Sequence, residues 1–130
     1  MNQITKLTLS ILPERIAVCR LAPDTPFPVW AVAHAGFISI SRTSDELSIV
    51  CPEAQVPAGI KAEKGWRVFK VEGVLDFSLT GILATLLQPL AEHQISIFAI
   101  STFDTDYILV KEEKLTDAIA ALKKVCQIKD

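Results

Sequence analysis

The sequence lacks any apolar run long enough to cross a lipid bilayer. Polar residues interrupt every hydrophobic stretch well before the roughly 20 residues that a membrane-spanning helix needs. The first six residues, Met1–Lys6, do not combine a basic region with an apolar core, as an export signal does. We therefore expect a cytoplasmic protein that does not enter a membrane.

The sequence also has few cysteines and no large excess of charge of one sign. The three cysteines, Cys19, Cys51 and Cys126, lack Cys-x-x-Cys spacing, which argues against both a disulfide framework and a zinc site. We expect them to be buried thiols. The formal net charge is only −2, and acidic and basic residues are interspersed, so the sequence offers no electrostatic footprint for nucleic acid.

No catalytic motif is present. The sequence has no glycine-rich phosphate loop, no Gly-x-Ser-x-Gly and no His-Glu-x-x-His, and its two histidines, His34 and His93, stand alone. Asp104 and Asp106 alternate in a predicted turn, where two carboxylates are more typical of a solvated loop than of a metal site. We expect no enzyme activity, no bound metal and no cofactor.

Apolar residues, in contrast, are abundant. Half of the 130 residues are hydrophobic and the mean hydropathy is +0.37, a composition typical of a packed core. The first half of the chain predicts strands over residues 5–12, 16–19, 37–40 and 47–50, a short helical segment at 29–35 and a loop at 52–65 that coils briefly near its end. The strands predicted over residues 37–40 and 47–50 form a hairpin.

The second half shows clearer periodicity. Strands are predicted over residues 66–71, 95–100 and 107–110, the last two near the middle of a covered sheet. Apolar residues at i, i+4 and i+8 predict a helix over 82–90, with Ser78 or Thr80 as its cap and a kink or break at Pro89. A closing amphipathic helix is predicted over residues 115–125.

The two halves repeat one pattern at a constant offset of 60 residues, which aligns Ser41 with Ser101 and Val50 with Val110. Such self-similarity indicates one structural unit used twice. We therefore expect an α+β protein with one module over residues 1–60 and another over residues 61–130. The residues predicted to form its core are Leu9, Ile38, Ile40, Ile49, Val68, Ile82, Leu86, Ile97, Ile100, Leu109, Ile119 and Leu122.

One polar cluster stands between two strongly apolar strands. The run Ser101–Asp106 concentrates hydroxyls and carboxylates at a point where the sheet holds them rigidly. A carboxylate there can pair with an ammonium group, and backbone N–H groups near Gly81 and Ile82 at a helix start can receive a carboxylate. Together these two requirements describe an amino acid. The alternative, that the hydroxyls cap the hairpin and bind nothing, stays open.

The run Ser-Thr-Phe-Asp-Thr-Asp-Tyr-Ile-Leu-Val at residues 101–110 is the most specific part of a longer resemblance. Residues 73–110 look like the ACT domain of the CASTOR type, named after eukaryotic arginine sensors. Residues 43–50 and 65–67 extend the resemblance to small bacterial proteins with paired ACT domains. The resemblance implies two tandem ferredoxin-like (βαββαβ) modules packed side by side, with an amino acid bound at the interface between modules.

The resemblance also implies roles for individual residues. Asp106 would hold the amino group or a cationic side chain of the ligand, and Thr102 and Phe103 would form the wall of the site. The turn at Gly81 and Ile82 would meet the ligand carboxylate. The matching candidates in the first module are Thr43 and Glu46.

Amino-acid sensing, in which ligand binding changes an interface that a partner protein reads, is therefore the first functional hypothesis. A purely structural interaction module without a ligand is the second, and a small enzyme is the third. Because ACT modules tend to pair and the high apolar content leaves module edges to cover, we also expect a homodimer.

Overall fold

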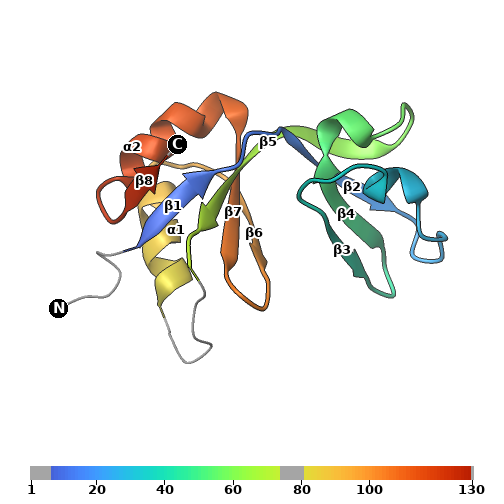
Figure 1. Ribbon diagram of the computed structural model, residues 1–130, viewed down its shortest axis with the longest axis horizontal. Coiled ribbons are helices and arrows are strands. Elements are labelled where there is room, and N and C mark those ends of the chain that lie inside the picture. The colour runs from blue at the N-terminus through green and yellow to red at the C-terminus, as the bar shows by residue number, and fades with distance from the viewer. Residues whose placement is uncertain (1–6, 74–80, 130) are drawn as a thin grey trace. The chain divides into compact units, whose positions relative to one another are not determined.

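The computed structural model describes residues 7–73 and 81–129 (Figure 1). The chain divides into two compact units. We call residues 7–13, 67–73 and 81–129 the helical unit, and residues 14–66 the strand unit. Strand β5, Lys61–Val71, begins in the strand unit and ends in the helical unit.

The helical unit has a ferredoxin-like order. It contains β1 (Thr8–Ile11), the end of β5, α1 (Ile82–Glu92), β6 (Ile97–Ser101), β7 (Asp106–Lys111), the 3-10 turn η4 (Glu112–Lys114), α2 (Leu115–Leu122) and β8 (Gln127–Lys129). From β5 to β8 the elements follow as strand, helix, strand, strand, helix, strand. The strands lie in the order β8-β1-β5-β7-β6, and β1 pairs antiparallel with β5 and parallel with β8. The first strand of the chain is thus inserted between two strands of the second half.

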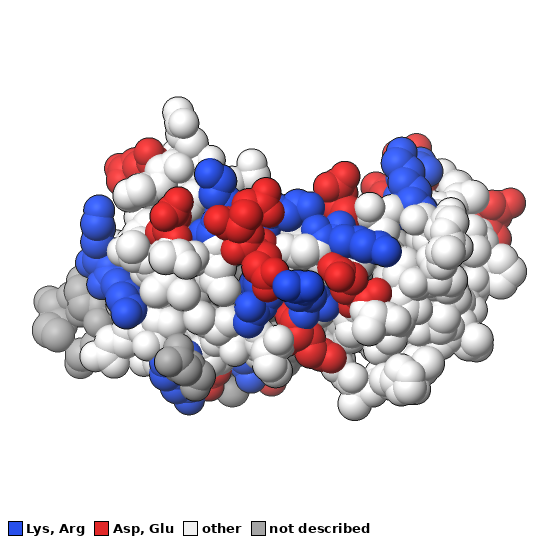
Figure 2. Space-filling view, turned by 90° about the horizontal axis from the view of Figure 1, so that it is seen from above, with Lys and Arg blue, Asp and Glu red and all other residues white. Residues whose placement is uncertain are grey.

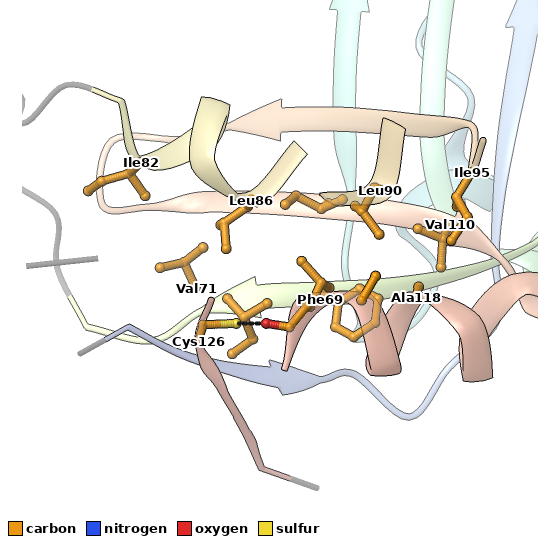
Figure 3. Packing of buried hydrophobic residues seen from close by; sticks show 13 residues of the cluster. Phe69, Val71, Ile82, Leu86, Leu90, Ile95, Val110, Ala118 and Cys126 are labelled. Carbon is orange, nitrogen blue, oxygen red and sulfur yellow. Dashed lines mark hydrogen bonds between the residues drawn. The ribbon is translucent and has the colours of Figure 1, made fainter. Parts of the chain in front are cut away.

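Both helices of this unit pack against one face of its sheet (Figure 3). Side chains alternate between the two faces of a strand, so every second residue of β5 and β7 points to the helices. The buried residues of this core are Leu9, Phe69, Val71, Ile82, Leu86, Leu90, Ile95, Ile108, Val110, Ala118, Ala121, Leu122 and Cys126. Full burial of a large aliphatic side chain contributes about 1.5–3 kcal/mol, so this core fixes the helices on the sheet.

The strand unit is smaller and contains no α-helix, and the structure describes all of its residues. It contains β2 (Ile16–Leu21), the 3-10 turn η2 (Val29–Val32), β3 (Ser39–Arg42), β4 (Leu47–Pro52), the 3-10 turn η3 (Glu53–Gln55) and the start of β5. The antiparallel strand order is β3-β4-β2-β5. The buried residues of its core are Ala17, Cys19, Ala31, Leu47, Ile49 and Cys51.

Two predictions for the first half differ from the structure. The segment 29–35 forms a single 3-10 turn rather than two helical turns, because a helix this short forms too few hydrogen bonds to offset the cost of its nucleus. The end of the loop predicted over 52–65 is in fact the first part of β5. Gly65, with φ 81°, lies where the register between β2 and β5 shifts, and it resembled a loop residue although it occupies a β-bulge.

Three predictions for the second half also need correction. Helix α1 continues through Pro89 to Glu92, so the predicted break is wrong; the only intrahelical bond that Pro89 cannot donate is the one to Thr85. Strand β6 pairs with β7 alone within the described part of the chain, which makes β6 an edge strand and not a central one. The closing helix ends at Leu122, and β8 follows it; the βαββαβ resemblance implies such a strand, but the residue pattern did not predict one. The predicted caps Ser78 and Thr80 lie outside the described residues.

The core prediction is confirmed for the central elements and only partly for the edges. The predicted core residues that are buried are Leu9, Ile49, Val68, Ile82, Leu86, Leu109 and Leu122. Those that are half-buried are Ile38, Ile40, Ile97, Ile100 and Ile119. Most of the second group lie in or next to the edge strands β3 and β6, where one side of the strand has no neighbour to cover it. All three cysteines are buried free thiols, as expected.

Candidate functional site

The predicted binding residues of the second half gather at one end of the helical unit. In Figure 1 the turn between β6 and β7, the end of β5 and the start of α1 lie at the same, lower end of this unit. Figure 3 agrees, since Ile82 and Val71 lie together at one end of the core and Ile95 and Val110 at the other. The fold therefore brings the run Ser101–Asp106 and the turn at Gly81 to the same end of one sheet.

Asp106 is the half-buried carboxylate of this cluster. It is the first residue of β7 and faces Ser101, the last residue of β6, in the strand register. The Ser101 Oγ donates a hydrogen bond of 2.6 Å to Asp106 Oδ1. Asp104, in contrast, is exposed, as expected for a residue in a solvated turn. The carboxylate of Asp106 is thus held in one orientation, with its other oxygen able to accept a further donor.

The turn between these two strands is closed by its own threonines. Thr102 N donates to the carbonyl of Thr105 at 2.8 Å, and Thr102 Oγ1 donates to the same carbonyl at 3.1 Å. Thr105 N in turn donates to Thr102 Oγ1 at 3.4 Å. Phe103 projects from this turn with 79% of its surface exposed. A large exposed aromatic residue on a rigid turn suits the predicted wall of a binding site.

The other predicted arm is the start of α1. Gly81 has a left-handed conformation with φ 79°, and the first intrahelical bond runs from Thr85 N to the Gly81 carbonyl at 2.9 Å. Among the residues that the structure describes, no atom lies within 4 Å of the place where a Cβ would stand on Gly81. Ile82, which follows, is buried and anchors the helix start in the core. The first N–H groups of a helix lack intrahelical acceptors and favour a negative charge.

Thr43 and Glu46 occupy the equivalent turn of the strand unit. Thr43 N donates to the Glu46 carbonyl at 2.9 Å, and Thr43 Oγ1 accepts hydrogen bonds of 3.1 Å from Asp45 N and Glu46 N. Both turns therefore have four residues and a threonine at the first position. This geometry shows a turn closed by its own side chain, and these bonds use the Thr43 hydroxyl and the Glu46 backbone, not the Glu46 carboxylate.

Comparison of the two hairpins corrects the repeat offset from 60 to 59. The pair that closes the first turn is Arg42 with Leu47, and the pair that closes the second is Ser101 with Asp106. Leu47 therefore corresponds to Asp106, and Glu46 corresponds to Thr105. An offset of 60 would match the core-facing Ile49 with a residue on the other face of the second sheet, because a slip of one residue exchanges the faces of a strand.

This corrected alignment singles out Asp106. Leu47 is 1% exposed and belongs to the core of the strand unit, whereas the same position of the helical unit carries a carboxylate. Asp106 lies two residues before the core residue Ile108 on the same face of β7, so it points to the side of the sheet that carries the helices. Core packing does not explain a carboxylate where the other hairpin carries a buried leucine, which makes Asp106 the stronger ligand-binding candidate of the two turns.

One residue of this site was not anticipated from the sequence. Thr105 is 4% exposed and is the only buried polar residue in the described part of the chain. Its hydroxyl donates a hydrogen bond of 2.8 Å to the carbonyl of Val71, the last residue of β5. A threonine at the end of a polar turn carries no sequence signal of this contact, because its partner is a backbone carbonyl 34 residues away.

The charges of the surface are mixed. Figure 2 shows Lys and Arg side chains intermixed with Asp and Glu on the face in view, as expected from the interspersed sequence. Within residues 7–73 and 81–129, no group of three or more His, Cys, Asp or Glu side chains is placed to hold a metal ion. Neither described helix is long and apolar enough to cross a membrane.

Family models match both parts of the chain. A model described as an ACT domain matches residues 61–124, and a second model, described as an N-terminal domain, matches residues 14–59. Among curated proteins, the mouse (Mus musculus) cytosolic arginine sensor for mTORC1 subunit 1 is 31% identical in an alignment that covers 94% of this chain and 43% of the sensor. The chain thus spans less than half the length of the curated relatives it matches.

Solved structures share the fold. Protein Atu0741 from Agobacterium tumefaciens is 36% identical with a TM-score of 0.89, over 95% of this chain and 92% of that one. The ligand-free regulatory subunit of aspartate kinase from Thermus thermophilus has a TM-score of 0.62 at 12% identity, over 88% of this chain and 96% of that one, which shows likeness of fold alone. The predicted ACT resemblance and the α+β fold are therefore confirmed, and the ferredoxin-like order is shown for the helical unit, whereas the strand unit contains no α-helix. The matches support a regulatory role in binding a small molecule.

Proposed function

Because the chain belongs to the ACT-domain family, we propose that it is an amino-acid sensor and not an enzyme. In this proposal the ligand binds at the end of the helical unit, between the turn Ser101–Asp106 and the start of α1. Binding there would change a surface that a separate protein reads. The curated relatives are named cytosolic arginine sensors, which supports an amino acid as the ligand class and a cytosolic location.

The observation that carries the proposal is the half-buried carboxylate of Asp106 at a position where the equivalent hairpin has the buried Leu47. In the proposed complex, Asp106 accepts a hydrogen bond from the ligand ammonium or from a cationic side chain. Partial burial strengthens such a charge-assisted bond relative to one at a fully exposed site. The Ser101 hydroxyl orients the carboxylate, and Thr102 and Phe103 form the wall.

The ligand carboxylate would be received by the backbone at Gly81 and Ile82. The helix α1 has 11 residues, and within the described part of the chain no side chain caps its first turn. Its first N–H groups and the positive end of its dipole both favour an anion. An amino acid carries an ammonium and a carboxylate on one carbon atom, so it fits a site with a carboxylate on one arm and the N–H groups of a helix start on the other. Thr43 and Glu46 remain weaker candidates, because their turn has a leucine in place of Asp106.

The experiment begins with a thermal-shift screen of the parent protein against each of the twenty standard amino acids, L-arginine included. A ligand at 100 times its dissociation constant stabilises the folded state by about 2.7 kcal/mol, which the screen detects easily. The amino acid with the largest shift is then titrated calorimetrically into the parent, into Asp106→Asn and into the matched control Asp104→Asn. The Asn side chain keeps the shape and the bond to Ser101 but removes the negative charge.

Loss of the charge-assisted bond in Asp106→Asn costs about 1.5–3 kcal/mol, which lowers affinity roughly tenfold to more than a hundredfold. Asp104→Asn should bind like the parent, because Asp104 is exposed in the turn. Equal affinity in all three proteins would refute the assignment of Asp106. If no amino acid binds to the parent, the structural interaction module without a ligand becomes the better hypothesis.

The oligomeric state is a further part of the proposal. A sensor transmits ligand binding through an interface with another subunit or protein, and the dimer of identical subunits is the commonest homo-oligomer. We expect a homodimer in solution, with a mass of twice 14.2 kDa by light scattering at micromolar concentration. A mass of one subunit under these conditions would contradict it.

A further inference from the structure

Thr105 is buried in a turn whose other residues are exposed. With 4% of its surface accessible, it contrasts with Thr102, Phe103 and Asp104, which precede it and are all exposed. The hydrogen bonds that close the turn use the hydroxyl of Thr102 and the backbone of Thr105. The hydrogen bonds that close the turn do not use the Thr105 hydroxyl, which instead donates to the Val71 carbonyl outside the turn.

The bond ties the turn to the end of β5. Leu9 and Val71 face each other in the register of β1 and β5, and the neighbouring Glu72 N donates to Thr8 O at 2.9 Å. Hydrogen-bonded and non-hydrogen-bonded pairs alternate in an antiparallel ladder, so the Val71 carbonyl points away from β1 and toward β7. Strand β7, which pairs with β5, begins only at Asp106. The Thr105 hydroxyl supplies a donor to this buried carbonyl one residue before β7 starts.

Val71 also reaches the other arm of the site. Its side chain is fully buried and belongs to the same core cluster as Ile82, the first residue of α1. Figure 3 shows Val71 and Ile82 at the same end of this core. The backbone of Val71 therefore holds the turn through Thr105, while its side chain packs in the region that anchors the start of α1.

From these contacts we infer that Thr105 is the positioning residue of the amino-acid site. It sets the separation between the turn that carries Asp106 and the helix start that receives the ligand carboxylate. The inference rests on the proposed function, since it concerns the affinity of that site. A ligand with its two charges on one carbon atom bridges both arms, so its affinity depends on their separation. Thr105 itself does not touch the ligand.

The test compares two substitutions at this position with a control in the same core. Thr105→Val keeps the shape and removes the hydroxyl, whereas Thr105→Ser keeps the hydroxyl. Val110→Ala truncates a fully buried residue at the opposite end of the core, so it lowers stability without touching the turn. The probe is the amino acid that gives the parent its largest thermal shift among the twenty, titrated calorimetrically at a temperature where every variant is folded.

We expect Thr105→Val to lower affinity about fivefold, the factor that corresponds to the net free energy of one hydrogen bond. Thr105→Ser should restore most of the affinity, and Val110→Ala should bind like the parent despite its lower thermal stability. Parent affinity in Thr105→Val, or an equal loss in Val110→Ala, would overturn the inference while leaving the proposed function intact. Failure of the parent to bind any amino acid would overturn the proposed function and this inference with it.

If Thr105→Val does not fold, hydrogen exchange on the parent protein tests the positioning role of Thr105. With the probe at saturation, the amides of Glu72 and Gly73 should exchange more slowly, together with those of residues 102–106. The coupling follows from the Thr105 bond, because Glu72 and Gly73 follow the residue that accepts it. Slower exchange in residues 102–106 alone, with no change at Glu72 and Gly73, would also overturn the inference.

Discussion

An exchange of residues between the two hairpins tests whether Asp106 is kept for binding or for folding. Leu47 and Asp106 occupy equivalent positions, each directly after a four-residue turn and each on the face of the sheet that carries the core. We consider Asp106→Leu in the helical unit and Leu47→Asp in the strand unit. If packing alone selected these residues, the two substitutions would have comparable costs.

The structure predicts a strong asymmetry. A leucine at the partly exposed position 106 buries most of its surface, which contributes about 1–2.5 kcal/mol of the 1.5–3 kcal/mol of full burial. This gain offsets the lost bond to Ser101, which is worth about 0.5–1.5 kcal/mol. The net change for Asp106→Leu therefore lies between a loss of about 0.5 kcal/mol and a gain of about 2 kcal/mol in stability. Leu47→Asp removes a side chain that is 1% exposed and buries a carboxylate, at a cost of at least about 4 kcal/mol.

The assay is urea unfolding of both variants and the parent, followed by fluorescence, together with titration of the amino acid identified in the screen. Asp106→Leu should unfold at or above the parent midpoint and bind no more tightly than Asp106→Asn. Leu47→Asp should unfold at a far lower urea concentration. A loss of more than about 2 kcal/mol in Asp106→Leu would refute the reasoning, because it would show that the carboxylate stabilises the hairpin.

Three further predictions follow from the described contacts. Leu86→Ala should lower the free energy of unfolding by about 2–5 kcal/mol, because Leu86 is fully buried between α1 and the sheet, and a loss below about 1 kcal/mol in urea unfolding would contradict its core position. The three cysteines should resist alkylation in the folded protein and react in denaturant, since all are buried and burial raises the pKa of the Cys126 thiol to about 11. Alkylated cysteines are counted by mass spectrometry, and fast labelling of the folded protein would contradict their burial. The hydrogen bond from the Ser10 hydroxyl lowers the pKa of the Glu72 carboxyl, and Lys129 has a smaller effect in the same direction. Glu72 therefore contributes stability above its unfolded pKa of about 4.3. This contribution is lost as the pH falls through the lower pKa of the folded state. Glu72→Gln should therefore lose less stability than the parent between about pH 5 and pH 3 in thermal unfolding, and identical losses would show that Glu72 is not the group involved.

Local periodicity was a sound guide to individual elements. The i, i+4, i+8 spacing predicted α1, because it records which side of a helix is buried. A continuous apolar run predicted β7, and two apolar segments around a polar connector predicted the hairpin of the strand unit. Local periodicity was less informative for Lys61–Gly65, where charged residues and a bulge glycine look like a loop although the backbone pairs with β2. The short strand β8 also escaped prediction, because three residues are too few to show a period.

The candidate site was predictable in part for the same reason. Asp106 directly precedes the apolar strand predicted over residues 107–110, and its half-buried place at the start of β7 agrees with that position. The role of Thr105 was not predictable. Its partner is the carbonyl of Val71, and a backbone carbonyl has the same chemistry at every position of the chain.

The amino-acid sequence was thus sufficient to determine the α+β class, the main strands and helices, and the polar turn between β6 and β7. Only the tertiary structure decided that β1 lies between β5 and β8, that the two hairpins align at an offset of 59 residues, and that Thr105 joins the turn to the end of β5. The physical reason is that the burial of a side chain leaves a periodic trace in its own segment. The pairing of distant segments depends on backbone hydrogen bonds, which any residue except proline can form.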